Sequence, residues 1–159
     1  MPKPRVYVET TVPSFYHDPR TSPAVLARRR WTRLWWVRAA ERYDLVTSRY
    51  VLDELAAGTQ ALARHRVSLL DGVRVLPSDP TVEETVRIYI QQKLMPAEPP
   101  NDAWHLALAS SSGCDFIVTW NCRHLANPNK AGRIERLNQA LGLYVPRLVT
   151  PRDLLRRGR

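Results

Sequence analysis

The chain of 159 residues is predicted to be an α/β protein, a three-layer α/β/α sandwich with a central, mainly parallel sheet. Short β-branched runs alternate along it with longer segments of helical periodicity, which is the pattern of successive strand–helix units. No internal repeat, low-complexity tract or linker interrupts this alternation. Hydrophobic residues make up 44% of the chain, which allows helices to cover both faces of a parallel sheet.

The expected elements follow one another along the whole chain. The run RVYVE alternates and is β-branched, which indicates a strand, and the turn-prone TTVPS closes it. In chain order, the expected strands are 5–9, 43–48, 74–77, 115–120 and 147–150, and the expected helices are 22–42, 49–58, 60–70, 81–94, 101–112 and 131–141.

Local signals set the ends of several helices. Ser22 can cap the first long helix, and Pro23 fits its first turn. Gly58 is expected to terminate the next helix, because glycine readily adopts the conformation that ends a helix. Pro80 opens another helix, and Asn101 is a good N-cap for the helix that follows the proline-rich break MPAEPP.

Length and composition predict one globular domain spanning residues 1–159. The chain is long enough to bury one core and too short for two ordinary domains. No apolar run is long enough to cross a bilayer, and the start, MPKPRVYVE, has no signal-peptide core, so a cytoplasmic protein is expected. Cys114 and Cys122 lack the paired spacing of a zinc site, so both are expected to be reduced thiols.

Positive charge dominates the composition. Twenty-four Lys and Arg stand against fifteen Asp and Glu, which gives a net charge of +9, and almost all of the cations are Arg. The planar guanidinium group suits phosphate, so nucleic acid is the favoured partner. The alternative is a generic basic surface, or one that an acidic protein neutralises, because net charge affects association with many kinds of partner.

Polar side chains stand where three of the expected strands end. Glu9 closes the first strand, Ser48 follows the second, and Asn121 ends the strand DFIVTW. Ligands of such sheets bind beyond the carboxyl ends of the strands, so these side chains are expected to share one edge. Carboxylate and amide oxygens gathered there, in a basic chain, indicate a divalent metal that acts on a polyanion.

Asp102 is the most distinctive acidic residue. It falls in the first turn of the helix after Asn101, on the stripe of Leu106 and Ala109, which should face the sheet. A carboxylate turned toward the core is costly unless something positive meets it, which favours a metal ligand. Taken alone, Asp102 is explained equally well as a complement to the helix dipole.

Three further residues belong to the candidate region. Glu54 lies nearer than Asp53 to the apolar stripe of its helix, so Glu54 is expected to point inward and Asp53 toward solvent. Glu9 alone is more simply explained as a polar residue at a strand end. His105 is expected to pack or to orient a ligand, because no second His stands at a zinc-ligand offset.

Four motifs occur in order along nearly the whole chain. They are VETT at 8–11, the S-x-x-V-x-x-E-L pattern at 48–55, DAWHLALA at 102–109 and DFIVTWNCRHLAN at 115–127. Together they resemble PIN-domain nucleases, in particular the VapC-type toxins of bacterial toxin–antitoxin pairs. Four ordered and spaced motifs are much more specific than any one of them.

This resemblance implies an endoribonuclease that uses Mg²⁺ or Mn²⁺ to hydrolyse RNA. By position, Glu9, Glu54 and Asp102 become the metal ligands, and Asn121 takes the fourth catalytic position. The chain departs from the family pattern twice, with Glu for the commoner Asp at position 9 and the neutral Asn121 for an acid. A weakly held second metal is the expected consequence. Thr10, Ser48 and Thr119 are expected to orient waters or ligands.

The resemblance also implies a small antitoxin as partner. The helix expected over 22–42 is wide in its apolar coverage and dense in Arg, so it is expected to dock that antitoxin or a second copy of the chain in a homodimer. Two other functions fit the sequence. One is a non-catalytic RNA-binding module with a degraded site, for which Glu9 and Asn121 argue, and the other is a regulatory domain that binds an acidic protein.

Overall fold

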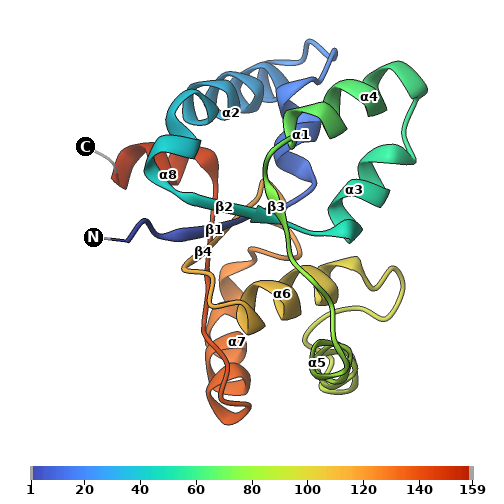
Figure 1. Ribbon diagram of the computed structural model, residues 1–159, viewed down its shortest axis with the longest axis vertical. Coiled ribbons are helices and arrows are strands. Elements are labelled where there is room, and N and C mark those ends of the chain that lie inside the picture. The colour runs from blue at the N-terminus through green and yellow to red at the C-terminus, as the bar shows by residue number, and fades with distance from the viewer. Residues whose placement is uncertain (1, 158–159) are drawn as a thin grey trace.

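A five-stranded sheet forms the centre of the protein, and every neighbouring pair of strands is parallel (Figure 1). The computed structural model describes residues 2–157. The strands lie in the order β3-β2-β1-β4-β5, so the first strand of the chain is the middle one. Their bounds are β1 (Arg5–Val8), β2 (Asp44–Thr47), β3 (Arg74–Val75), β4 (Phe116–Val118) and β5 (Arg147–Val149). The predicted parallel sheet is confirmed.

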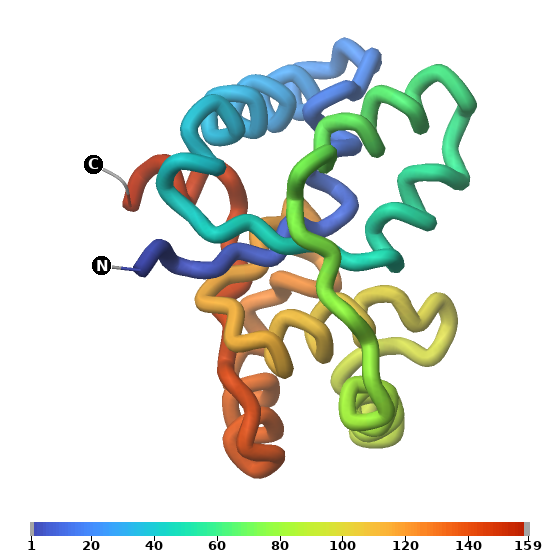
Figure 2. Tube along the Cα trace, viewed as in Figure 1, coloured from blue at the N-terminus to red at the C-terminus, as the bar shows by residue number. Residues whose placement is uncertain are grey.

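Helices cover both faces of the sheet, as predicted for an α/β/α sandwich. They are α1 (Thr11–Tyr16), α2 (Pro23–Arg42), α3 (Arg49–Ala56), α4 (Gln60–Leu69), α5 (Pro80–Gln91), α6 (Asn101–Ser111), α7 (Pro128–Ala140) and α8 (Pro151–Arg157). Helices α1, α2, α4 and α8 lie on one side of the sheet, and α5, α6 and α7 lie on the other (Figure 1, Figure 2). Helix α3 contacts both groups, because it packs against α4 and α6. In the part of the chain that the structure describes, no helix is long and apolar enough to cross a membrane.

Capping residues fix several helix starts as the sequence predicts. The Ser22 hydroxyl accepts a hydrogen bond from the Val25 amide, and Pro23 occupies the first position of α2. Asp79 was not among the predicted caps, but it accepts from the Val82 amide in the same way at the start of α5.

Two helices form where none was expected. The segment TTVPS was predicted to be a turn, but it begins α1, with Pro13 in the first turn. An amide at that position has no partner within a helix, so the missing N–H of Pro13 costs nothing there. After the last strand, Pro151 starts the short helix α8.

The start of one predicted helix and the N-cap of another were wrong. Helix α7 begins at Pro128 instead of near residue 131, because the Asn127 side chain accepts from the Asn129 amide. Asn101 is the first residue of α6 and Pro100 occupies the cap position, so Asn101 is not the N-cap. Asp102 stays in the first turn, as predicted.

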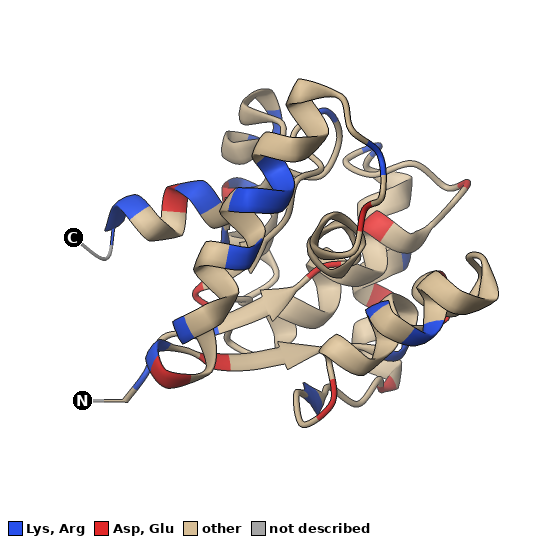
Figure 3. Cartoon of the chain, turned by 90° about the horizontal axis from the view of Figure 1, so that it is seen from above, with Lys and Arg blue, Asp and Glu red and all other residues tan. Residues whose placement is uncertain are grey.

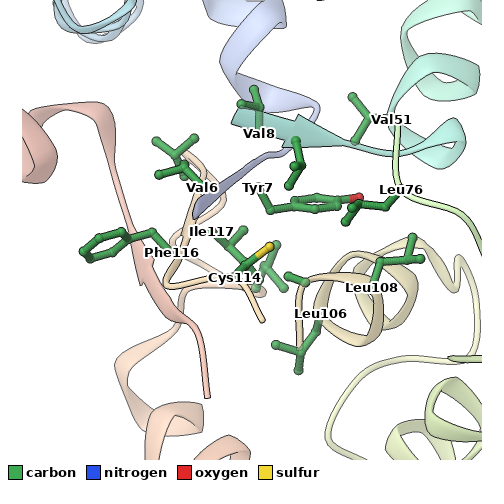
Figure 4. Packing of buried hydrophobic residues seen from close by; sticks show 14 of the residues in the cluster. Val6, Tyr7, Val8, Val51, Leu76, Leu106, Leu108, Cys114, Phe116 and Ile117 are labelled. Atoms are coloured by element: carbon green, nitrogen blue, oxygen red, sulfur yellow. The ribbon is translucent and has the colours of Figure 1, made fainter. Parts of the chain in front are cut away.

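The central strand β1 anchors the core. Val6, Tyr7 and Val8 are fully buried, and alternation along the strand places Tyr7 on the opposite face from the two valines. Figure 4 shows the Tyr7 ring on the side of α6, where Leu106 and Leu108 are buried. The same alternation therefore directs one polar group, the Tyr7 hydroxyl, into the layer that carries α6.

A buried polar cluster joins three helices on that side. The Asn138 side chain of α7 donates to the Ser110 hydroxyl of α6 at 2.9 Å and to the Tyr144 carbonyl at 2.7 Å. Its carbonyl oxygen accepts from the Tyr89 hydroxyl of α5 at 2.6 Å. Because Asn138 is fully buried, removing the amide would take one hydrogen bond from each of these groups and leave Tyr89 and Ser110, among residues 2–157, with only their mutual 3.4 Å contact.

We therefore expect Asn138→Ala to lower the free energy of unfolding by about 3 kcal/mol, since it removes the three hydrogen bonds of a buried side chain. The exposed neighbour Gln139→Ala is the matched control and should change it by less than about 0.5 kcal/mol. Urea denaturation of both variants measures the difference. Equal stabilities would show that the cluster does not hold the three helices together.

Candidate active site

The candidate residues gather at the carboxyl edge of the sheet. Strand β1 pairs with β2 on one side and with β4 on the other, so the segments that follow all three strands meet there. Glu9 lies one residue beyond the end of β1, and its amide donates to the Val118 carbonyl of β4 at 3.2 Å. Ser48 and Thr119 follow β2 and β4. The predicted common edge is confirmed.

Glu9 is held by one of its two carboxylate oxygens. Its Oε1 accepts from the Thr119 hydroxyl at 2.6 Å, the Thr11 hydroxyl at 2.5 Å and the Thr11 amide at 3.0 Å. Both hydroxyls are oriented in turn, because Thr11 accepts from the Trp120 amide and Thr119 from the Asn121 amide. The Glu9 Oε2 receives no hydrogen bond from residues 2–157.

The carboxylate of Glu9 is buried, with 3% of the residue exposed. Burial raises the pKa of Glu9, because the low-dielectric surroundings disfavour the charge, and the nearby His105 and the threonine hydrogen bonds offset this only in part. Within the described part of the chain, no Lys or Arg forms an ion pair with Glu9. A charge held in this way is costly unless a cation lies nearby.

Asp102 and Asn121 face each other across the edge. The Asn121 side-chain nitrogen lies 3.5 Å from each carboxylate oxygen of Asp102. The Asn121 Oδ1 accepts from the His124 amide at 3.2 Å, which orients the amide group toward Asp102. Asp102 also has no Lys or Arg ion-pair partner among residues 2–157.

Glu54 belongs to a separate chain of hydrogen bonds. Its Oε1 accepts from the Thr10 hydroxyl at 3.0 Å and lies 2.8 Å from His105 Nε2. Burial alone would raise the pKa of Glu54, but the hydrogen bonds from His105, Thr10 and Asn101 outweigh it and hold this pKa below its usual value. Glu54 therefore favours its charged form and already has a polar partner.

The chain of hydrogen bonds continues into the core. His105 is fully buried, and its Nδ1 lies 2.7 Å from the Tyr7 hydroxyl, which lies 2.6 Å from the Ser48 hydroxyl. With a neutral imidazole, His105 donates to Glu54 and accepts from Tyr7, and Tyr7 accepts from Ser48, so every group is paired. Burial raises the pKa of Tyr7 well above its usual value, so its hydroxyl stays protonated.

The structure thus divides the four predicted site residues into two groups. Glu9 connects to Asn121 through the Thr119 hydroxyl, and Asn121 contacts Asp102, whereas Glu54 pairs with His105. In residues 2–157, no three side chains of His, Cys, Asp or Glu lie close enough together to hold a metal ion. The predicted ligands Glu9, Glu54 and Asp102 share one edge of the sheet without forming one compact group.

Other expectations for single residues had mixed outcomes. Asp53 is exposed and lies 3.6 Å from Arg49, so its predicted solvation is confirmed. His105 packs in the core and contacts a carboxylate, which is also as predicted. Ser48 was expected to orient waters or ligands, but its hydroxyl caps α3 and contacts Tyr7.

Two residues that contact the candidate groups were missed. Tyr7 could have been found from the alternation of RVYV, which sets it apart from the valines on the other face of β1. Thr11 gave a weaker signal. Its position two residues after Glu9 allows its amide and hydroxyl to turn back onto that carboxylate, but only if a helix begins there.

The PIN domain family matches residues 7–127, more than half of the chain and all four predicted site residues. The chain belongs to the PIN domain family. PIN domains are generally metal-dependent nucleases that act on nucleic acid. A comparison with curated proteins found no match.

The side chains of this PIN domain fit a hard divalent cation in their chemistry. Among residues 2–157, one carboxylate oxygen of Glu9 is unpaired, and Asp102 meets only the long contacts from Asn121. Oxygen ligands of this kind suit Mg²⁺ or Mn²⁺, which keep part of their water shell and need few protein ligands. Glu54 fits less directly, because its Oε1 is engaged by His105 and Thr10.

The buried charge of Glu9 leads to a stability prediction. Burial raises the pKa of Glu9 in the folded protein above its ordinary value of 4.5, so the folded state favours the protonated form. Relative to Glu9→Gln, the wild type should therefore lose stability as the pH rises through the raised value. In EDTA at about pH 8 we expect Glu9→Gln to be more stable by about 1 kcal/mol, and at about pH 4 the difference should vanish.

Urea denaturation of the wild type and Glu9→Gln at both pH values measures this difference. Added Mn²⁺ should raise the stability of the wild type and leave Glu9→Gln nearly unchanged. A variant that is less stable than the wild type in EDTA at the higher pH would mean that the three hydrogen bonds to Oε1 outweigh the cost of burying the charge.

Proposed function

We propose that this PIN domain is a Mg²⁺- or Mn²⁺-dependent endoribonuclease and the toxin of a toxin–antitoxin pair. The observation that carries the proposal is the pair of carboxylates, Glu9 and Asp102, that lie at one edge of the sheet without a cationic partner among residues 2–157. Carboxylates that gather at one edge are unfavourable unless a cation or protons neutralise them. The net charge of +9 supports a polyanionic substrate.

In this proposal, Glu9, Glu54 and Asp102 hold the metal, and Asn121 orients Asp102 or a metal-bound water. When bound, the metal supplies a nucleophilic water of lowered pKa and neutralises charge on the phosphate. The threonine hydroxyls and the Thr11 amide keep Glu9 Oε1 in place, so its Oε2 is the oxygen available to a ligand. His105 and Thr10 fix the rotamer of Glu54, which restricts how this carboxylate can approach.

A second candidate is a PIN-like module that binds RNA without cleaving it. The pairing of Glu54 with His105, and the separation of the carboxylates into two groups, favour this alternative. Both candidates predict RNA binding. They differ in whether the protein also cleaves RNA when a divalent metal is present.

The first test replaces Asp102 by Asn, which keeps the shape of the side chain and removes its charge. We expect RNA cleavage in Mn²⁺ to fall by at least about a hundredfold, because a metal contributes several kcal/mol to the transition state. Asp53→Asn is the matched control, since Asp53 is exposed on α3, and it should cleave at the wild-type rate. Wild-type cleavage should also stop in EDTA.

The same variants test the toxin role. Expression of the wild type and of Asp53→Asn should arrest cell growth, whereas Asp102→Asn should not, and a small protein encoded beside the gene should relieve the arrest. Cleavage by Asp102→Asn at the parental rate would exclude Asp102 as an essential residue. RNA binding by the wild type without any metal-dependent cleavage would favour the binding module.

The neutral residue Asn121 leads to a separate prediction. An amide oxygen can ligate a cation or orient a water, but it adds no charge, so a second metal should bind weakly. We expect Asn121→Asp to bind a second Mn²⁺ about tenfold more tightly than the wild type. Calorimetric titration of both proteins measures this. An unchanged affinity for the second Mn²⁺ would mean that position 121 is not at the metal centre.

A further inference from the structure

A second group of basic side chains surrounds the end of α1, away from the carboxylates. His17 follows α1, Arg33 comes from α2, and His65 and Arg66 come from α4. We call these four residues the α1 basic cluster. The imidazole rings of His17 and His65 lie 5.5 Å apart, and the Arg33 guanidinium lies over the Tyr16 ring at 5.1 Å.

The arginines of this cluster have donors left over. Arg33 donates through Nε to the Tyr16 carbonyl at 2.9 Å, and Arg66 donates through Nη2 to the Ser14 carbonyl at 3.2 Å. These contacts complement the carbonyl end of α1, which is one reason for a cation there. Each guanidinium carries five N–H donors, however, and the buried Arg66 Nε has no hydrogen-bond partner in the part of the chain that the structure describes. A buried donor of this kind normally meets an acceptor.

The positive charge of the cluster is offset in part by Asp18, which interacts electrostatically with Arg66. The nearby carboxylate, Asp18, is buried and is bound through both oxygens by Arg20. In the described residues, no carboxylate forms an ion pair with any member of the cluster. Burial, and then the electrostatic effect of the basic neighbours His65, Arg33 and Arg66, lowers the pKa of His17. An anion of outside origin would relieve this repulsion.

The position of the cluster indicates which anion it meets. Helix α1 has six residues, so it is about 9 Å long, and its first residue is Thr11, which binds Glu9. A single RNA strand covers this distance with a few nucleotides. Figure 3 shows Lys and Arg along the C-terminal helix α8, and α8 packs against α2, the helix that carries Arg33 of the cluster.

We propose that the α1 basic cluster binds a backbone phosphate of the RNA substrate, a few nucleotides from the phosphodiester at Glu9. The proposal rests on the proposed ribonuclease function for the choice of RNA. Arginine forks and imidazole donors at close range match the oxygens of a phosphate. The cluster would hold the strand in register along α1 and contributes no group to the reaction itself.

The test measures the binding of a short labelled single-stranded RNA by fluorescence anisotropy, in EDTA so that no cleavage occurs. Arg66→Gln removes one charge from the cluster, and Arg64→Gln removes one from an exposed position two residues away on α4. We expect Arg66→Gln to bind about tenfold more weakly than Arg64→Gln. The slope of log affinity against log salt should also be shallower by about 0.7, the value for one lost phosphate contact.

A second pair of variants keeps the test decisive if Arg66→Gln is poorly folded. His65 is exposed, so His65→Glu should fold, and it places a carboxylate in the cluster. Arg64→Glu changes the net charge by more, so a non-specific effect of charge would weaken RNA binding more in this control. Weaker binding by His65→Glu than by Arg64→Glu would support the phosphate site, and the reverse order would overturn it.

A labelled poly-glutamate peptide tests whether the cluster instead binds an acidic protein. If Arg66→Gln lost affinity for this peptide and bound RNA as well as Arg64→Gln does, the cluster would be a protein-binding surface and the proposal would be wrong. Binding in EDTA is independent of cleavage. If the wild type failed to cleave RNA in Mn²⁺, the ribonuclease proposal would therefore be wrong. The binding measurements would still show whether the cluster binds RNA.

Discussion

Strand β1 is hydrogen-bonded on both sides, and the arrangement of the candidate site depends on this pairing. Because β2 and β4 are its neighbours, residues separated by more than a hundred positions meet where β1 ends, as Thr119 and Glu9 do. Val6, Tyr7 and Val8 of this strand are fully buried, so its alternation also decides which helix layer each of these side chains enters. Tyr7 enters the layer of α6 and thereby reaches His105.

The two groups of carboxylates differ in how far the protein stabilises their ionised form. Glu54 receives hydrogen bonds that stabilise its ionised form, and its pKa is held low. Glu9 is more deeply buried, and its pKa is raised although three donors surround one of its oxygens. Hydrogen bonds from hydroxyl and amide groups therefore do not replace a cation at Glu9. The arginines, meanwhile, collect around α1 and α2, where they meet backbone carbonyls and aromatic rings.

The sequence allowed the sheet, most helices and the shared edge to be predicted, because each depends on local patterns. Apolar runs mark the strands, and parallel pairing alone then brings Glu9, Ser48 and Asn121 to one side. Helix α1 was missed because its residues favour turns, and packing against α2 and α4 stabilises it. The pairing of Glu54 with His105 could not be predicted either. It depends on how α3 and α6 approach each other, and no periodicity in either helix encodes that distance.

The hydrogen bonds around Glu9 also make this carboxyl group asymmetric. Thr11 and Thr119 each accept from a backbone amide, and both hydroxyls lie within donating distance of Oε1. A proton on Oε1 would compete with these hydroxyls and with the Thr11 amide, so Oε2 is the favoured position for a proton that Glu9 takes up. The two oxygens of one carboxyl group thus have different roles, one held by the protein and the other available to a proton.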